Sequence, residues 1–274
     1  MSTAQPRAKT AAMAAPTRAR IACTAVGLAL GVALAAPARA DTSRLDAVLG
    51  SGKLRVCTPG DYKPFSLARP DGGYEGIDID LVQSAAKALG VQVEMVKTSW
   101  PKLMDDFIEK CDIAVGGISV TTDRAKRAGF ANAYMVNGKA PITKCENVAK
   151  FQTVADLNKP TVTVITNPGG SNERFVRTYL PNAKVVVHND NTTIFDEILK
   201  GTADVMISES VETKVQQKAK PGLCAVNPDK PLQYGEMSYL LPRGDVAMKE
   251  WFDTWMHLAK ASGEFDRTVD KYLK

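Results

Sequence analysis

Short apolar runs alternate with segments of helical periodicity in the first half of the chain, and this alternation limits the possible folds more than any other feature. Strand-like runs lie at 54–58, 91–96 and 113–115. Between them, 79–89 and 100–108 carry apolar residues at helical spacing. Because strands that alternate with helices pair in parallel beneath those helices, we expect an α/β domain with a largely parallel sheet.

The second half repeats this alternation without an obvious sequence repeat. The expected elements are strands at 162–165, 184–187 and 204–207, and helices from about Asn172 and at 194–199. The last segment, 248–272, is predicted to be one helix. Trp251, Trp255, Leu258 and Phe265 would mark its buried face.

Residues 1–40 have the order of a secretory signal. Four Lys or Arg residues precede a short apolar run at 21–35, and Ala38-Arg39-Ala40 follows as a small-residue cleavage site. The run is short for a membrane span. We therefore expect export to the periplasm and a working chain that begins at about Asp41, with an uncleaved anchor as the alternative.

The net charge of the chain comes from this leader. Five of the 35 Lys and Arg residues lie in residues 1–40, which hold no Asp or Glu. The remaining chain is therefore balanced, with 30 Lys or Arg against 30 Asp or Glu. Nothing in this balance favours nucleic acid or an anionic membrane as a partner.

Four cysteines follow the leader, and their spacing matches no zinc motif. With only two histidines in the chain, we expect neither a metal nor a cofactor. Export permits disulfides. Cys145 and Cys224 lie in loop-like surroundings, and we predict a disulfide between them. Cys57 and Cys111 lie in strand-like runs and are expected as buried thiols, with a bridge between them as the alternative.

The order of several short segments resembles the periplasmic amino-acid-binding proteins of ABC importers. These segments are Leu54-Arg55-Val56, Pro64-Phe65, 76–81, Asp112-Ile113-Ala114, 121–124 and Ala203-Asp204-Val205. The resemblance covers essentially all of the chain after the leader. It implies the type II periplasmic binding protein fold, with two α/β lobes joined by two crossover strands and a ligand cleft between them. Lobe 1 would comprise 41–138 and 233–274, and lobe 2 would comprise 139–232.

A second set of segments resembles the cyclohexadienyl dehydratases, enzymes built on that same fold. These segments are 60–66, 98–101, 138–143, 167–173 and 191–195. The resemblance implies conversion of prephenate to phenylpyruvate and of arogenate to phenylalanine, with loss of water and carbon dioxide. It implies no cofactor, and its partners are these small molecules.

Two basic residues are candidates for binding the substrate carboxylates. Arg124 follows a turn that begins at Ser119, and its guanidinium can bind a carboxylate through two parallel hydrogen bonds. Lys139 stands where the chain is expected to cross between lobes. The resemblance implies substrate contact for Arg124 and Ser119 and a catalytic role for Lys139. From composition alone, both basic residues could be solvated surface groups.

Gly169-Gly170-Ser171 precedes the helix expected near Asn172. Glycines allow close approach of the backbone, and a helix N-terminus offers free N–H groups to an anion. An ordinary turn with Ser171 as the N-cap fits the same residues. The resemblance makes Gly170, Ser171 and Asn172 substrate contacts and Glu173 the general acid. Enclosure in the cleft would raise the pKa of Glu173, whereas stabilisation by the helix dipole is the simpler explanation for an acid there.

Asp61, Trp100 and Glu209 complete the predicted substrate-binding set. Trp100 fits an aromatic wall against a ring-shaped ligand, although core packing would also explain it. Asp61 and Glu209 are acids expected near strand ends. Amino-acid-binding proteins usually carry Asp where Glu209 stands. The Glu at this position therefore argues against a function limited to binding an amino acid.

Two functions therefore remain open at the level of sequence. One is an exported dehydratase acting on prephenate or arogenate. The other is a non-catalytic binding protein that delivers an amino acid or small acid to the permease of an ABC importer. Both share the fold, the leader and the cleft, and only the site residues named above separate them.

Overall fold

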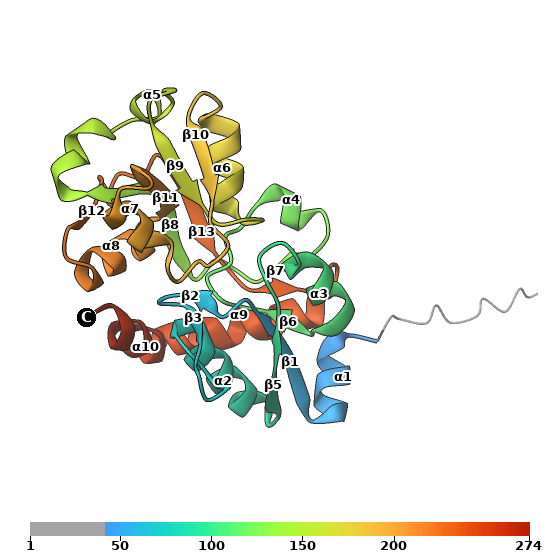
Figure 1. Cartoon of the computed structure of the whole chain (residues 1–274). Helices are drawn as coiled ribbons and strands as arrows, with labels where there is room; N and C mark the ends of the chain where they lie inside the picture. Colours follow the sequence, from blue (N-terminus) through green and yellow to red (C-terminus); the bar gives the residue numbers. More distant parts are fainter. Residues whose placement is uncertain (1–41) are drawn as a thin grey trace, which may run out of the picture. The chain divides into compact units, whose positions relative to one another are not determined.

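The computed structural model describes residues 42–274, and these residues contain two α/β halves, each built on its own sheet (Figure 1). The predicted leader and its cleavage site lie outside the described residues. Within residues 42–274 no helix is long and apolar enough to cross a membrane.

The first sheet has the strand order β5-β1-β6-β14-β7. Its strands are β1 (Lys53–Thr58), β5 (Gln92–Lys97), β6 (Ile113–Ala114), β7 (Gly129–Phe130) and β14 (Leu240–Leu241). β1, β5 and β6 are parallel, as predicted, whereas β14 returns from far along the chain and pairs antiparallel with β6 and β7. A small antiparallel sheet joins β2 (Asp61–Tyr62), β3 (Ser66–Ala68) and β4 (Tyr74–Glu75).

The second sheet has the order β10-β9-β11-β8-β12, and β13 pairs with β8. Its strands are β8 (Met135–Lys144), β9 (Thr163–Thr166), β10 (Lys184–Val187), β11 (Val205–Glu209), β12 (Leu223–Ala225) and β13 (Gln233–Met237). β9, β10 and β11 are parallel, and β8 runs antiparallel to β11.

Helices accompany both sheets. The first half contains α1 (Arg44–Ser51), α2 (Ile77–Leu89), α3 (Leu103–Lys110), α4 (Thr122–Ala125), α9 (Val246–Ala261) and α10 (Glu264–Leu273). The second half contains η1 (Cys145–Lys150), α5 (Val154–Leu157), α6 (Ser171–Tyr179), α7 (Ile194–Lys200) and α8 (Ser210–Ala219).

The chain passes between the halves along β8 and returns along β13 (Figure 1). These two strands are antiparallel, and Lys139 of β8 is opposite Gln233 of β13. This is the two-lobe arrangement with paired crossover strands expected from the sequence. The residue limits proposed for the lobes, 41–138 with 233–274 and 139–232, remain a prediction.

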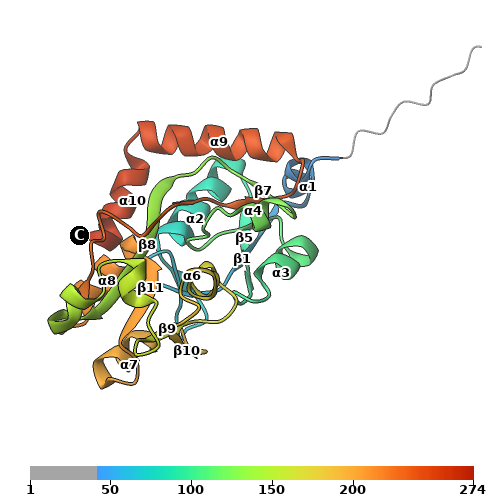
Figure 2. The ribbon, with the colours of Figure 1, turned by 90° about the horizontal axis from the view of Figure 1, so that it is seen from above.

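The C-terminal segment is not one helix, contrary to the prediction for 248–272. It divides into α9 and α10, which run in different directions (Figure 2). Gly263 stands between them with a φ of 74°, in the left-handed region that ends a helix. Trp255 and Phe265 are buried as expected. Leu258 is 59% exposed, because the buried face of α9 is formed instead by residues such as Phe252, Trp255 and Met256.

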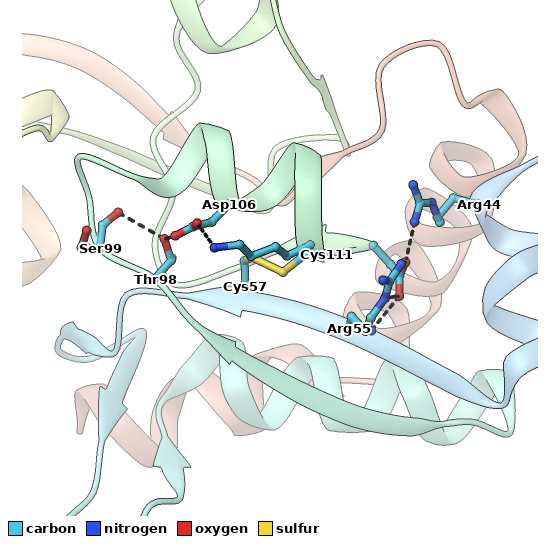
Figure 3. Close-up of a disulfide and its surroundings, with 9 residues drawn as sticks. Arg44, Arg55, Cys57, Thr98, Ser99, Asp106 and Cys111 are labelled. Atoms are coloured by element: carbon cyan, nitrogen blue, oxygen red, sulfur yellow. Dashed lines mark hydrogen bonds and ion pairs between the residues drawn. A yellow bond between two sulfur atoms is a disulfide. The ribbon is translucent and has the colours of Figure 1, made fainter.

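Residues 42–274 contain two disulfides. The bond between Cys145 and Cys224 joins η1 to β12, and it is the pair expected from the sequence. Cys57 and Cys111 also form a disulfide, so the bridge that was the alternative to buried free thiols is the state found. This second bond joins β1 to the end of α3 (Figure 3). Cys111 is the C-cap of α3 and not part of a strand.

Candidate active site

The ammonium group of Lys139 is the centre of a buried polar cluster in the second half. Its Nζ donates to Ser171 Oγ at 2.8 Å, Asn172 Oδ1 at 2.5 Å and Glu209 Oε1 at 2.6 Å. These partners come from α6 and from the end of β11. Burial lowers the pKa of Lys139, and the charge of Glu209 opposes that shift. All three N–H donors of Lys139 are therefore bonded within the protein, and its charge is paired with the Glu209 carboxylate.

Ser119 joins this cluster from the first half. Its Oγ donates to Glu209 Oε1 at 2.8 Å and lies 3.0 Å from Ser171 Oγ. Arg124 Nη1 donates to the Ser119 carbonyl at 2.8 Å. Burial lowers the pKa of Arg124 to about 10, so the guanidinium remains charged at neutral pH. Arg124 thus contacts Ser119 directly, and Lys139 is connected to Ser119 through Glu209 and Ser171.

Trp100 and Asp61 form a second contact at the site. Trp100 Nε1 donates to Asp61 Oδ1 at 2.9 Å, and Arg124 Cζ lies 6.0 Å from the centre of the Trp100 ring. Burial raises the pKa of Asp61. Asn191 Nδ2 donates to the Asp61 carbonyl at 3.1 Å, which ties this group to the second half.

Three buried polar atoms at the site have no hydrogen-bond partner among residues 42–274. They are Tyr62 Oη, Asn167 Oδ1 and Asn191 Oδ1. All three side chains line one small cavity of about 20 Å³, together with Trp100 and Gly170. Because unpaired buried polar groups are costly, their convergence indicates a place where a polar ligand completes the hydrogen bonding.

A wider cavity of about 340 Å³ adjoins this cluster. Ser119, Lys139, Ser171 and Glu209 form part of its lining. Its volume is within the range of small-molecule sites. The polar cluster is therefore accessible from a space large enough for a small acid.

Ser171 is not the N-cap of α6, which was the simplest interpretation of the sequence at the start of this helix. Gly170 is the N-cap and Ser171 is the first helical residue, and no side chain caps the helix. The Ser171 hydroxyl instead faces Lys139 and Ser119. Gly170, Ser171 and Asn172 all line the small cavity, so these three predicted residues lie together there.

Glu173 lies apart from this group. Its Oε2 accepts from the Gly169 N–H at 2.7 Å, and its Oε1 accepts from Arg177 at 2.8 Å. These two bonds lower the pKa of Glu173, with the Gly169 N–H as the larger cause. The expected rise in its pKa is therefore wrong for this structure. The Glu173 side chain lines neither the 20 Å³ nor the 340 Å³ cavity, and the same holds for Glu212 of α8.

Glu212 is a candidate that the sequence interpretation missed. It stands in the first turn of α8, is 1% exposed, and accepts a hydrogen bond from Ser208 Oγ. Burial raises the pKa of Glu212 to about 8, so its carboxyl is largely protonated at neutral pH. One sequence feature could have indicated its burial. Glu212 lies four residues before Gln216 in α8, and this spacing puts both on the same, buried face of the helix.

The other predicted residues meet as expected. Arg124, Lys139, Ser119, Ser171, Asn172 and Glu209 share one network, and Asp61 and Trp100 join it through Arg124. Glu212 reaches the same network through Ser208, whose Oγ accepts from Asn172 Nδ2 at 3.3 Å. The site thus combines two cations with a protonated acid in a buried setting.

Known proteins resemble this chain closely. A cyclohexadienyl dehydratase of Pseudomonas aeruginosa is 45% identical over 246 residues, which cover 89% of this chain and 91% of that protein. The crystal structure of an ancestral amino-acid-binding protein, described as a precursor of cyclohexadienyl dehydratase, has a TM-score of 0.78 at 33% identity and covers 85% of this chain and 100% of its own. An ancestral cyclohexadienyl dehydratase has a TM-score of 0.54 at 46% identity, covering 85% of this chain and 98% of its own.

The family assignment rests on most of the chain. A family model matches residues 54–274, which include both sheets and every site residue described above. The chain belongs to the bacterial extracellular solute-binding proteins, family 3.

Proposed function

We propose that this protein is an exported, periplasmic cyclohexadienyl dehydratase that converts prephenate to phenylpyruvate and arogenate to phenylalanine. The 45% identity to a protein of that name supports the proposal. The observation that carries it is Glu212, a buried carboxyl that is largely protonated at neutral pH beside a cationic cluster. A carboxyl in this form is suited to donating a proton during a reaction.

The reaction makes three demands on the protein. The ring carboxylate leaves as carbon dioxide, and the electron pair of its C–C bond enters the ring as the C–O bond to the hydroxyl breaks. The departing hydroxide takes one proton and leaves as water, and the ring becomes aromatic. The protein must hold the carboxylates, supply that proton and limit access of water.

Arg124 and Lys139 supply the charges that bind the two carboxylates of prephenate. They come from different halves of the molecule and meet at Ser119 and Glu209. Trp100, in contact with Tyr62 at 5.8 Å between ring centres, forms an aromatic wall for the ring. Glu209 and Asp61 are available for the ammonium group of arogenate.

Glu212 is the proton donor in this proposal, in place of Glu173. A general acid is most effective when its pKa is close to the working pH. Burial raises the pKa of Glu212 to about 8, whereas hydrogen bonds to Gly169 and Arg177 lower the pKa of Glu173. Glu173 is consequently ionised at neutral pH and better suited to stabilising the start of α6.

The direct test is incubation of the purified chain from Asp41 onward with prephenate and, separately, with arogenate. We expect phenylpyruvate and phenylalanine to form. Titration with amino acids in the same buffer is the matched binding measurement. If the protein binds amino acids and forms neither product, it is instead a solute-binding protein for an importer.

That alternative has one specific observation in its favour. The ancestral precursor with a TM-score of 0.78 is an amino-acid-binding protein, so the fold and much of the site also suit binding alone. Export is tested separately, since N-terminal sequencing of the secreted protein should find a start at or near Asp41.

A further inference from the structure

A second large cavity includes Glu212 in its lining and has no lining residue in common with the 340 Å³ cavity beside Lys139. It measures about 480 Å³, and its lining includes Glu212, Asp61 and Asn191. Val215 and Gln216, one turn along α8 from Glu212, also line it. We call this space the acid-side cavity.

The acid-side cavity reaches from the buried site to the surface. Lys63, Thr192 and Ala219 line it and are exposed, whereas Glu212 and Asn191 line it and are buried. Asn191 also lines the 20 Å³ cavity at Trp100 and Gly170, and its Oδ1 is unpaired among the described residues. Asn191, a polar residue, is therefore part of the lining of both cavities.

The two carboxyl oxygens of Glu212 have different surroundings. Oε2 accepts from Ser208 Oγ, on the side of Asn172. Oε1 has no hydrogen-bond partner within residues 42–274. It is not fully enclosed either, so this oxygen retains some exposed surface. Oε1 is consequently the oxygen in position to exchange a proton with the cavity.

The proposed reaction consumes one proton in every turnover, and Glu212 cannot donate again until it regains one. We infer that the acid-side cavity is the route by which solvent returns a proton to Glu212 between turnovers. Atoms and charge balance in this step, because one proton from water or a buffer acid converts the Glu212 carboxylate back to the carboxylic acid. This inference rests on the proposed function.

The charged groups around Glu212 are consistent with this role. The charges of Asp61 and Glu209 favour the protonated form of Glu212, and that of Lys139 opposes it. Lys63 and Lys220 stand on the cavity wall, and Lys220 is paired with Asp196.

The test separates the first turnover from later ones. Glu212 begins protonated, so filling the cavity should spare the first turnover and slow those that follow. Val215→Trp adds bulk beside Glu212, and Ala219→Trp adds it at the exposed rim, farther from the acid. Lys214→Trp is the matched control, because Lys214 is exposed on the same helix and does not line the cavity.

The measurement is product formation after rapid mixing with excess prephenate. We expect at least one cavity variant to form about one equivalent of product at the parental rate and then to slow by about tenfold or more. The Lys214→Trp protein should show linear progress at the parental rate.

Two results would overturn the inference. In one, both cavity variants keep parental steady-state rates, which means that the proton returns through the substrate cleft. In the other, both lose first-turnover and steady-state rates equally, which means that the cavity walls only support the site. Absence of turnover in the parent protein is a different result, since it would reject the proposed function itself.

Discussion

The Nζ of Lys139 lies 2.6 Å from Oε1 of Glu209, and the two side chains are only 6% and 5% exposed. In such a pair, removal of one partner leaves an uncompensated buried charge. The pair also places a cation and a carboxylate at the edge of the substrate space, so its contributions to stability and to binding can be separated by paired substitutions.

We predict that Lys139→Met lowers the free energy of unfolding by about 3–5 kcal/mol and weakens prephenate binding. The double variant Lys139→Met with Glu209→Gln should recover much of the stability, because the unpaired charge is removed. It should not recover binding. Denaturant unfolding and substrate titration of the two proteins check this, and equal recovery of both properties would contradict the assignment of Lys139 to the substrate.

Glu212→Gln should reduce prephenate turnover by about 10²–10⁴-fold, because the amide keeps the shape but is not an acid. Substrate affinity should change much less, since Arg124 and Lys139 are retained. Glu173→Gln is the informative comparison, and its effect on turnover should be far smaller. The reverse order of these two effects in steady-state kinetics would return the acid role to Glu173.

The pH dependence of turnover should follow the same carboxyl. Because Glu212 must be protonated to act and its pKa is raised to about 8, kcat/KM should fall as pH rises above about 8. A pH series on the parent protein tests this directly. The residual activity of Glu212→Gln should lack that fall, and a parental profile that stays flat through pH 9 would exclude a donor of this kind.

The stability of the protein should respond to pH through Glu212 as well. Its pKa in the folded state is raised from 4.5 to about 8, so the folded protein binds this proton more tightly than the unfolded chain does. The resulting stabilisation is fully present below about pH 4.5 and is lost as pH rises through about 8. Unfolding measured at pH 5 and pH 9 should therefore show a smaller difference for Glu212→Gln than for the parent.

Arg124→Ala should weaken substrate binding by about 2–5 kcal/mol, because it removes a buried charged partner of a carboxylate. Arg124→Lys keeps the charge but loses the planar pair of donors, so it should restore only part of the affinity. Calorimetric titration of the three proteins checks the order. Unchanged affinity in Arg124→Ala would mean that the carboxylate is bound elsewhere.

The disulfide between Cys145 and Cys224 encloses a segment of 79 residues in sequence separation. Replacing both cysteines with serine should lower the free energy of unfolding by about 2–5 kcal/mol, because the unfolded chain regains conformational freedom. A non-reduced peptide map of the parent provides the prior check, and it should show both disulfides.

The sequence predicted the parallel parts of both sheets because runs such as 54–58 and 162–165 carry a local apolar pattern. It also identified most of the site residues, since Lys139 lies in a segment that resembles the cyclohexadienyl dehydratases and Arg124 lies in one that resembles the amino-acid-binding proteins. Local patterns do not report burial depth, however. Nothing in the spacing of Glu173 and Glu212 reveals that one is bonded to Gly169 and Arg177 while the other is enclosed.

The break at Gly263 was missed, and the Cys57–Cys111 bond was only an alternative, for a related reason. A helical pattern on both sides of a glycine is compatible with one helix or two, and only the packing of α10 decides between them. The bond between Cys57 and Cys111 depends on α3 ending beside β1, which is a property of the assembled fold.

Lys139 occupies a special place in the register of the second sheet. On β8 it is opposite Glu209 of β11 on one side and Gln233 of β13 on the other. It therefore stands at the residue where β8 exchanges one antiparallel partner for the other. The backbone of Lys139 is held from both sides by ladder partners, so the ammonium group extends from one of the most firmly positioned points of the crossover.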